Sequence, residues 1–251
     1  MKENKKKLND LIEILRKLRS PDGCEWDKKQ TSSSLLPYLL EETYELIEAI
    51  ENKDYINIKE ELGDLLLHVI FQAELYKEKK IFSLDDVIKT ISHKLIRRHP
   101  QVFTNQKQQN NWEVNKQKEK KRDSLLDGIP KTLPALARSS RIQEKAASVG
   151  FKWKSINLIW NKIDEEIAEL KEACSEKNET KIIEETGDLL FTIVNLSRFL
   201  NINSEESLKL AVKKFENRFH RLEKEIKERN KFIFDCSEEE MNEIWEVIKN
   251  K

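Results

Sequence analysis

Four acidic side chains in the second half of the chain have the spacing of a metal site. Glu166 and Glu169 are three residues apart, and so are Glu185 and Asp188. On a helix this spacing places two side chains on one face, about 5–6 Å apart. The two helices would be consecutive and joined by the short polar segment 175–178, so they should pack antiparallel. The four carboxylates would then converge and need a cation, and their hard oxygen atoms favour Mg²⁺, with Mn²⁺ as the alternative.

A solvated acidic surface is the simpler explanation, because 46 of the 251 residues are Asp or Glu. Two features count against it. Apolar residues such as Leu189 and Leu190 border the motif, and Gly63 and Gly187 lie inside expected helices. Glycine costs about 1 kcal/mol relative to alanine there. Close approach of another backbone or of a ligand would explain both glycines.

An iron site of the helical-bundle type is a further alternative. Such a site usually places a His three residues after a Glu. None of the four His residues stands three residues after a motif carboxylate. His68 follows Asp64 by four residues, which is better explained by packing at a helix edge. An all-carboxylate magnesium site therefore fits better.

The acidic pattern is duplicated. The first half carries it 124 positions earlier, in Glu42, Glu45, Glu61 and Asp64. Two cations of the first half recur 120 positions later: Lys94 and Arg98 correspond to Lys214 and Arg218. A duplication of one helical unit explains both correspondences.

Cationic side chains accompany the second copy. Lys162 precedes Glu166 by one helical turn, and Lys181 precedes Glu185 in the same way. Lys214 and Arg218 are four residues apart on a later helix, and these four cations could surround a polyphosphate. Trp245, in a Trp-Glu-Val sequence that repeats residues 112–114, could stack on a base.

The first copy lacks two of these cations. It has Tyr38 and Asn57 where the second copy has Lys162 and Lys181. The second half is therefore expected to hold the main site. A candidate second site in the first half comprises Glu42, Glu45, Glu61, Asp64, Lys94 and Arg98.

Helices are expected to position these residues. Apolar side chains recur at three- and four-residue steps over 8–18, 35–51, 56–79, 153–174, 179–200 and 204–228, and a further helix should begin after the N-cap Ser83. Only five Gly and five Pro are present, which favours long helices. The predicted domains are residues 1–104 and 135–251, separated by a polar linker over 105–134 that begins rich in Gln, Asn and Lys.

Composition narrows the function. Basic and acidic residues balance at 46 each, which gives no reason to expect nucleic-acid binding. Three unpatterned cysteines favour a reducing compartment. The longest apolar runs are far shorter than the ~20 residues that span a bilayer, and the N-terminus does not resemble a secretory signal. We expect a cytoplasmic protein with no membrane partner.

The motifs resemble those of the MazG family of nucleoside triphosphate pyrophosphohydrolases. The resemblance covers nearly the whole chain and rests on the duplicated acidic motifs and on residues 26–31, 37–42, 97–103 and 149–153. One departure is Glu25, where the family pattern has Pro before the Trp. It leaves open the shape of the loop that precedes the first acidic helix.

The resemblance implies an all-α fold of duplicated helical-bundle units, a homodimer, and Mg²⁺-dependent hydrolysis of NTPs and dNTPs to monophosphate and pyrophosphate for nucleotide-pool control. The implied metal-binding and catalytic residues are Glu166, Glu169, Glu185 and Asp188. The implied nucleotide contacts are Lys162, Glu165, Lys181, Glu184, Lys214, Arg218 and Trp245. Two other readings stay open: a non-catalytic helical assembly module, and cleavage of a guanosine alarmone at the same site.

Overall fold

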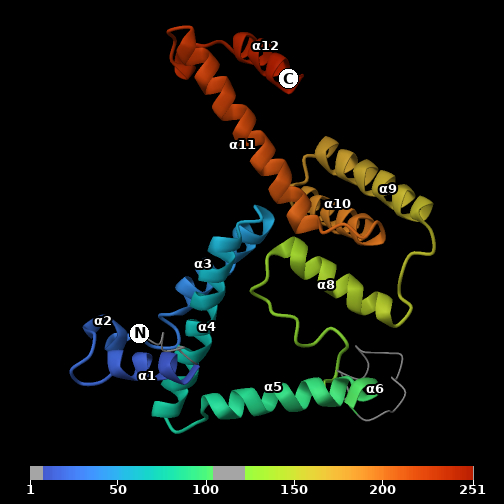
Figure 1. The fold of residues 1–251 in the computed structure, drawn as a ribbon. Helices are drawn as coiled ribbons and strands as arrows, with labels where there is room; N and C mark the ends of the chain where they lie inside the picture. The colour runs from blue at the N-terminus through green and yellow to red at the C-terminus, as the bar shows by residue number, and fades with distance from the viewer. Residues whose placement is uncertain (1–7, 104–121, 251) are drawn as a thin grey trace. The chain divides into compact units, whose positions relative to one another are not determined.

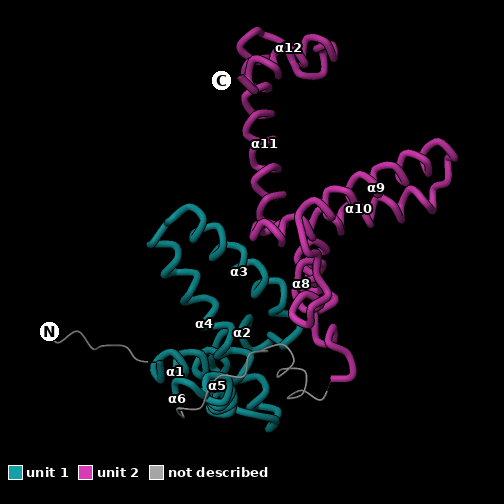
Figure 2. Tube along the Cα trace, turned by 90° about the vertical axis from the view of Figure 1, so that its right-hand side faces the viewer, with its two compact units in different colours: residues 1–108 teal, residues 109–251 magenta. Residues whose placement is uncertain are grey.

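The computed structural model describes residues 8–103 and 122–250 of the chain. Every regular element in these two ranges is helical, as predicted (Figure 1). The chain divides into two compact units, residues 1–108 and 109–251 (Figure 2). None of the described helices combines the length and the apolar character needed to span a membrane.

The first unit is built around the pair α3 and α4, which pack side by side. Helix α1 ends at Leu18, and its Leu15 packs with Ile70 and Phe71 of α4 in the core of the unit. The described helices of this unit are α1 (Leu8–Leu18), α2 (Glu25–Lys29), α3 (Leu36–Glu51), α4 (Tyr55–Glu78), α5 (Leu84–Arg98) and α6 (Pro100–Phe103).

The second unit is built around the pair α9 and α10, with α8 packed against α10. Ile159, Ile163 and Leu196 form a core between α9 and α10, while α12 packs on the end of α11 through a separate core. The described elements are α8 (Ala135–Ser148), α9 (Ile156–Ser175), α10 (Glu179–Phe199), α11 (Ser204–Glu228), the 3-10 helix η1 (Ile233–Asp235) and α12 (Glu238–Lys249).

The duplication is visible in the backbone. Lys53 between α3 and α4, and Lys177 between α9 and α10, both adopt a left-handed conformation, with φ of 56° and 54°. The next residue caps the following helix in both copies: Asp54 accepts hydrogen bonds from the backbone N–H groups of α4, and Asn178 accepts one from that of Lys181. The same tight turn therefore sets the two acidic helices side by side in each unit.

The predicted helical segments are confirmed, and Ser83 forms a capping box with Asp86 at the start of α5. Helices α8 and α12 are not among the predicted segments. The domain boundaries stay predictions, because residues 105–121 of the proposed linker, including Trp112, lie outside the described residues. Within the rest of the linker, Leu125 and Asp127 accept hydrogen bonds through their backbone oxygens from the buried Lys145 of α8.

Close approach of another backbone was one of the two explanations for the helical glycines, and the structure does not support it. Close approach of a ligand stays a prediction. At Gly63 and at Gly187, no described atom outside the immediate helix lies within 4 Å of the place a Cβ would occupy. No other segment of the described chain therefore presses on these positions.

Candidate active site

Carboxylates from α9 and α10 meet in the second unit. One oxygen each from Glu166, Glu185 and Asp188 lies within 4.8 Å of the other two. Glu166 is buried, with 4% of its surface exposed, whereas Asp188 is at the surface. Like charges this close repel one another and resist ionisation together. The cluster thus has the charge and the oxygen donors that a hard divalent cation requires.

Glu169 is not a member of the group of carboxylates whose oxygens lie within 4.8 Å of one another, but it is close to that group. The pKa of Glu185 is raised by burial first and then by the negative charges of Glu169 and Glu166. Glu169 is thus close enough to act electrostatically on the cluster. The structure brings three of the four predicted metal ligands together and places the fourth next to them.

Lys162 forms an ion pair with the buried carboxylate of Glu166. Its Nζ lies 2.7 Å from Glu165 Oε1 and 2.8 Å from Glu166 Oε1. These two contacts, the one with Glu165 first, raise the pKa of Lys162 above its ordinary range. The other oxygen of Glu166, Oε2, is buried and has no hydrogen-bond partner in the part of the chain that the structure describes. A buried carboxylate oxygen needs a partner, so the residues present fit a cation bound at this oxygen.

The other predicted nucleotide contacts are not members of this cluster, although Glu184 and Lys181 interact electrostatically with Glu185. Lys181 is exposed and pairs with Glu176 at 3.0 Å, and Glu184 is exposed on α10. Figure 1 shows α11 running away from the α9–α10 pair, with α12 at its far end. Lys214 is exposed on α11, Arg218 is half-buried there, and Trp245 of α12 packs on Phe215 with ring centroids 5.3 Å apart.

A large cavity opens beside the carboxylates. Its volume is about 920 Å³, and Lys162, Glu166 and Asp188 form part of its wall. Binding cavities for small molecules usually measure about 300–1,000 Å³. The remaining wall comes mainly from α8, from the loop 149–153, from residues 125 and 126, and from the later part of α10. Lys181, Lys214, Arg218 and Trp245 are not part of it.

The sequence-based reasoning missed this wall, although one signal pointed to it. Gly150 follows α8 with φ of 94°, and its N–H donates to Ala147 O while that of Phe151 donates to Ala146 O. This pair of bonds is a Schellman motif, which favours glycine at the left-handed position. The turn brings Phe151 and Trp153 to the cavity. Gly150 thus has a structural role in the motif 149–153. From the sequence alone, this motif contributes only to the family resemblance.

The first unit has a similar acidic cluster and a different cavity. Oxygens of Glu42, Glu45 and Glu61 lie within 4.8 Å of one another. The adjacent cavity measures only about 160 Å³ and includes Asp64 and the buried His68 in its wall. That volume is below the usual range for a small-molecule site.

Aromatic residues narrow this smaller cavity. Tyr38, which replaces the lysine of the second copy, meets Trp26 edge to face at 5.7 Å between ring centroids, and both line the cavity. Lys94 and Arg98 lie half-buried on α5 and are not in the wall. The first unit thus differs from the second in the size of its cavity as well as in its lack of two lysines.

The acidic cluster of the first unit predicts a pH effect. Burial, and next a hydrogen bond with Glu61, raise the pKa of Glu42 from 4.5 to about 7. The folded protein keeps this proton up to about pH 7, whereas the unfolded chain loses it near pH 4.5. The stabilisation is therefore complete below about pH 4.5 and is lost as the pH rises to about 7. In metal-free buffer, the melting temperature should fall over this range more steeply for the native protein than for Glu42→Gln. Parallel pH profiles for the two proteins would contradict the assignment.

Comparison with known proteins agrees with this geometry. The model of the MazG nucleotide pyrophosphohydrolase domain matches the chain twice, over residues 30–103 and 154–222. A Thermotoga maritima protein named nucleoside triphosphate pyrophosphohydrolase/pyrophosphatase MazG is 47% identical over 99% of this chain and 98% of its own length. The nucleoside triphosphate pyrophosphohydrolase of Escherichia coli K12 is 40% identical over 97% of both chains. Both matched ranges contain one acidic helix pair each. The chain therefore belongs to the MazG family of nucleotide pyrophosphohydrolases and carries the family's domain twice.

Proposed function

We propose that the protein hydrolyses nucleoside triphosphates and deoxynucleoside triphosphates to the monophosphate and pyrophosphate, with Mg²⁺, in the cytoplasm. The observation that carries the proposal is the meeting of Glu166, Glu185 and Asp188. Two of these carboxylates, Glu166 and Asp188, line a cavity of about 920 Å³ together with Lys162. The names of the two relatives support the reaction class. Control of the nucleotide pool is the corresponding cellular role.

The four carboxylates of the second unit are proposed to hold the cation. Glu166 would contribute its unpartnered Oε2, while its Oε1 stays paired with Lys162. Mg²⁺ at this position would neutralise charge on the phosphates and lower the pKa of a bound water. Mn²⁺ has the same preference for oxygen ligands and would substitute for it.

The reaction adds one water across a phosphoanhydride bond. The water oxygen bonds to the phosphorus that stays with the nucleoside, the bridging oxygen leaves with pyrophosphate, and a carboxylate of the cluster accepts the water proton. Lys162 holds Glu166 in place throughout, because its two ion pairs anchor it on α9. Lys181, Lys214 and Arg218 are candidates for contacts to the polyphosphate.

The first unit is proposed to bind a cation and to support assembly. Its acidic cluster also brings three carboxylates together, with Glu45 as a member in place of Asp64, the counterpart of Asp188. Its cavity is too small for a nucleotide. Large apolar side chains are exposed on the acidic helix pairs of both units, among them Ile56, Leu62, Ile183 and Leu190. Apolar faces of this kind mark interaction surfaces, which supports a homodimer.

A product assay tests the proposed reaction. The full-length protein is incubated with each of the eight common NTPs and dNTPs and with Mg²⁺, and the products are separated. Monophosphate and pyrophosphate are expected in equal amounts. Diphosphate and inorganic phosphate would show that a different bond is cut, and no product at all would favour the assembly module. Competition by guanosine tetraphosphate, followed through its own cleavage products, resolves the alarmone alternative.

A further inference from the structure

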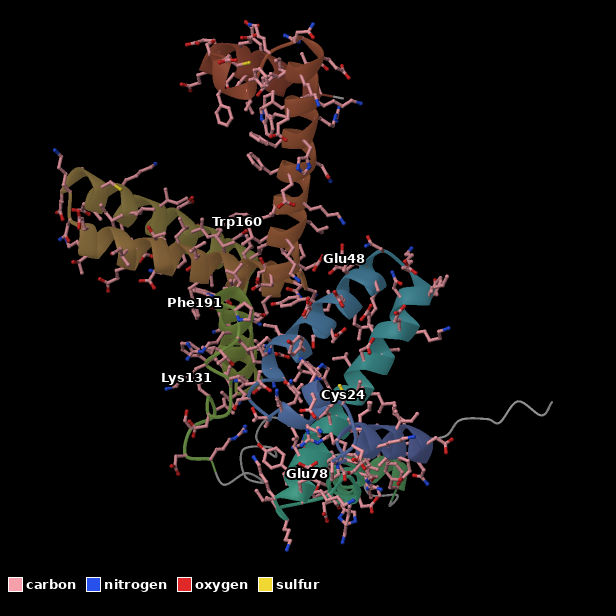
Figure 3. The ribbon with its side chains drawn as sticks, turned by 90° about the vertical axis from the view of Figure 1, so that its left-hand side faces the viewer. Cys24, Glu48, Glu78, Lys131, Trp160 and Phe191 are labelled. Atoms are coloured by element: carbon pink, nitrogen blue, oxygen red, sulfur yellow. The ribbon has the colours of Figure 1, made fainter. Side chains whose placement is uncertain are left out.

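One glutamine in the large cavity has an unused hydrogen-bonding atom. Gln143 of α8 is only 5% exposed, and its Nε2 donates to the backbone oxygen of Phe191 at 2.8 Å. Figure 3 labels Phe191 on α10, which packs against α8. This bond orients the amide, so that Oε1 is the atom left over. Gln143 Oε1 is buried without a partner in residues 8–103 and 122–250, and Gln143 lines the same cavity as Glu166 and Asp188.

A second unused atom lies in the same wall. Arg198 of α10 donates from Nη2 to Asn195 Oδ1 at 3.0 Å, and its Nε is buried with no partner among the residues described. Both residues line the cavity. Two residues of the cavity wall thus each carry a buried polar atom, one acceptor and one donor, without a partner among the described residues. Buried polar atoms are almost always paired in folded proteins, and two unpaired ones in one cavity indicate a ligand that carries both a donor and an acceptor.

Much of the rest of this wall is apolar, although Lys152, Thr192 and Asn195 also line it. Phe151, Trp153 and Ile142 line the cavity together with Gln143 and Arg198. A polyphosphate would gain nothing from aromatic and aliphatic side chains, whereas a base or a sugar has flat or apolar faces to bury against them. Trp245, to which base stacking was assigned, lies outside the cavity and packs on Phe215.

We propose that this part of the cavity binds the nucleoside end of the substrate and that Gln143 is a specificity-determining residue. Its Oε1 accepts a hydrogen bond from the nucleoside, either from a base N–H group or from a ribose hydroxyl. The inference rests on the proposed function, since it assumes that the phosphates lie at the carboxylates of the same cavity. Arg198 Nε supplies the complementary donor.

Kinetics with analogues of ATP test the proposal. The nucleoside donors of ATP are the 6-amino group and the two ribose hydroxyls. Each is removed in turn by purine ribonucleoside triphosphate, 2′-deoxy-ATP and 3′-deoxy-ATP. One of these three is expected to raise KM roughly tenfold in the native protein, the loss of one buried hydrogen bond. Which one does so identifies the base or the sugar as the source of the donor. A flat KM across the series overturns the proposal, whether or not any variant folds.

The variant Gln143→Met, of similar size and without the amide, completes the test. It should raise the KM for ATP roughly tenfold, with kcat changed by less than about twofold, and should be insensitive to the analogue that affects the native protein. The Ki of inorganic triphosphate, which has no nucleoside, should stay the same. Gln72→Met is the matched control, because Gln72 of the first unit is fully paired with Ser32. It should behave as native.

The outcomes separate this inference from the reaction itself. If Gln143→Met keeps the full analogue discrimination, or if Ki and KM rise together, Gln143 does not read the nucleoside, although the hydrolysis stands. If the native protein releases no monophosphate and pyrophosphate, the proposed function fails and this inference with it.

Discussion

The double variant Glu185→Gln and Asp188→Asn is expected to lose turnover by on the order of a thousandfold or more, since loss of a single stabilising group at an active site already costs about 10²–10³. Both side chains belong to the acidic cluster, and Asp188 also lines the large cavity. Their amides keep the shape of the carboxylates and remove the charge that would hold the cation. Steady-state release of pyrophosphate measures the effect.

Loss of folding would not explain this result. In the metal-free protein, burial and the neighbouring charges of Glu169 and Glu166 raise the pKa of Glu185, which means that its ionised form is disfavoured. Replacing it with Gln at pH 7 removes a repulsion. The melting temperature of the metal-free variant should therefore equal or exceed that of the native protein. A large decrease would indicate that these carboxylates stabilise the fold.

The duplication supplies a matched control for this variant. Glu61 and Asp64 occupy the corresponding positions of the first unit. Because the cavity beside them measures about 160 Å³, Glu61→Gln with Asp64→Asn should change kcat/KM by no more than about twofold. An equal loss in both double variants would mean that the two units act together or that the first unit also carries out the reaction.

Removal of divalent cations is expected to have an equally large effect. Treatment with a chelator should lower turnover below detection, and Mg²⁺ or Mn²⁺ should restore it, because the buried Glu166 and its neighbours offer only oxygen ligands. A protein that retains its turnover in excess chelator would disprove the metal-dependent mechanism.

Binding of the cation can be followed without activity. A ligand that binds only the folded protein stabilises it by about 2.7 kcal/mol at a concentration 100 times its Kd. Mg²⁺ should therefore raise the melting temperature of the native protein. The shift should become smaller in Glu185→Gln with Asp188→Asn. The shift that remains measures binding to the first unit, and it should disappear when Glu61 and Asp64 are also replaced.

Much of the fold follows from local rules. The apolar periodicity predicts α1, α3, α4, α9, α10 and α11, and the caps at Ser83 and Asn178 lie where short polar side chains precede the helices. Helix α8 was missed. It begins after Pro134 without a side-chain cap hydrogen bond, and both of its buried residues, Gln143 and Lys145, are polar. Periodicity detects apolar stripes, so a helix whose inward face is partly polar gives a weak signal.

The acidic site, too, follows in part from local rules and in part from tertiary contacts. Spacing along the chain places Glu166 with Glu169, and Glu185 with Asp188, because residues three apart share a helical face. The tight turn at Lys177 then sets the two helices side by side. The position of Trp245 did not follow from sequence, because the direction of α11 depends on its contacts with α8 and α10.

The sequence by itself determined that the chain is helical and duplicated, and that the second copy carries the fuller set of charges. Only the tertiary structure decided which of these charges share a cavity, that Gln143 and Arg198 line it, and that the matching space in the first unit is narrowed by Trp26 and Tyr38. The reason is physical. Helical periodicity is a property of neighbours within a few residues, whereas the volume and the lining of a cavity depend on how side chains distant in sequence fill the space between packed helices.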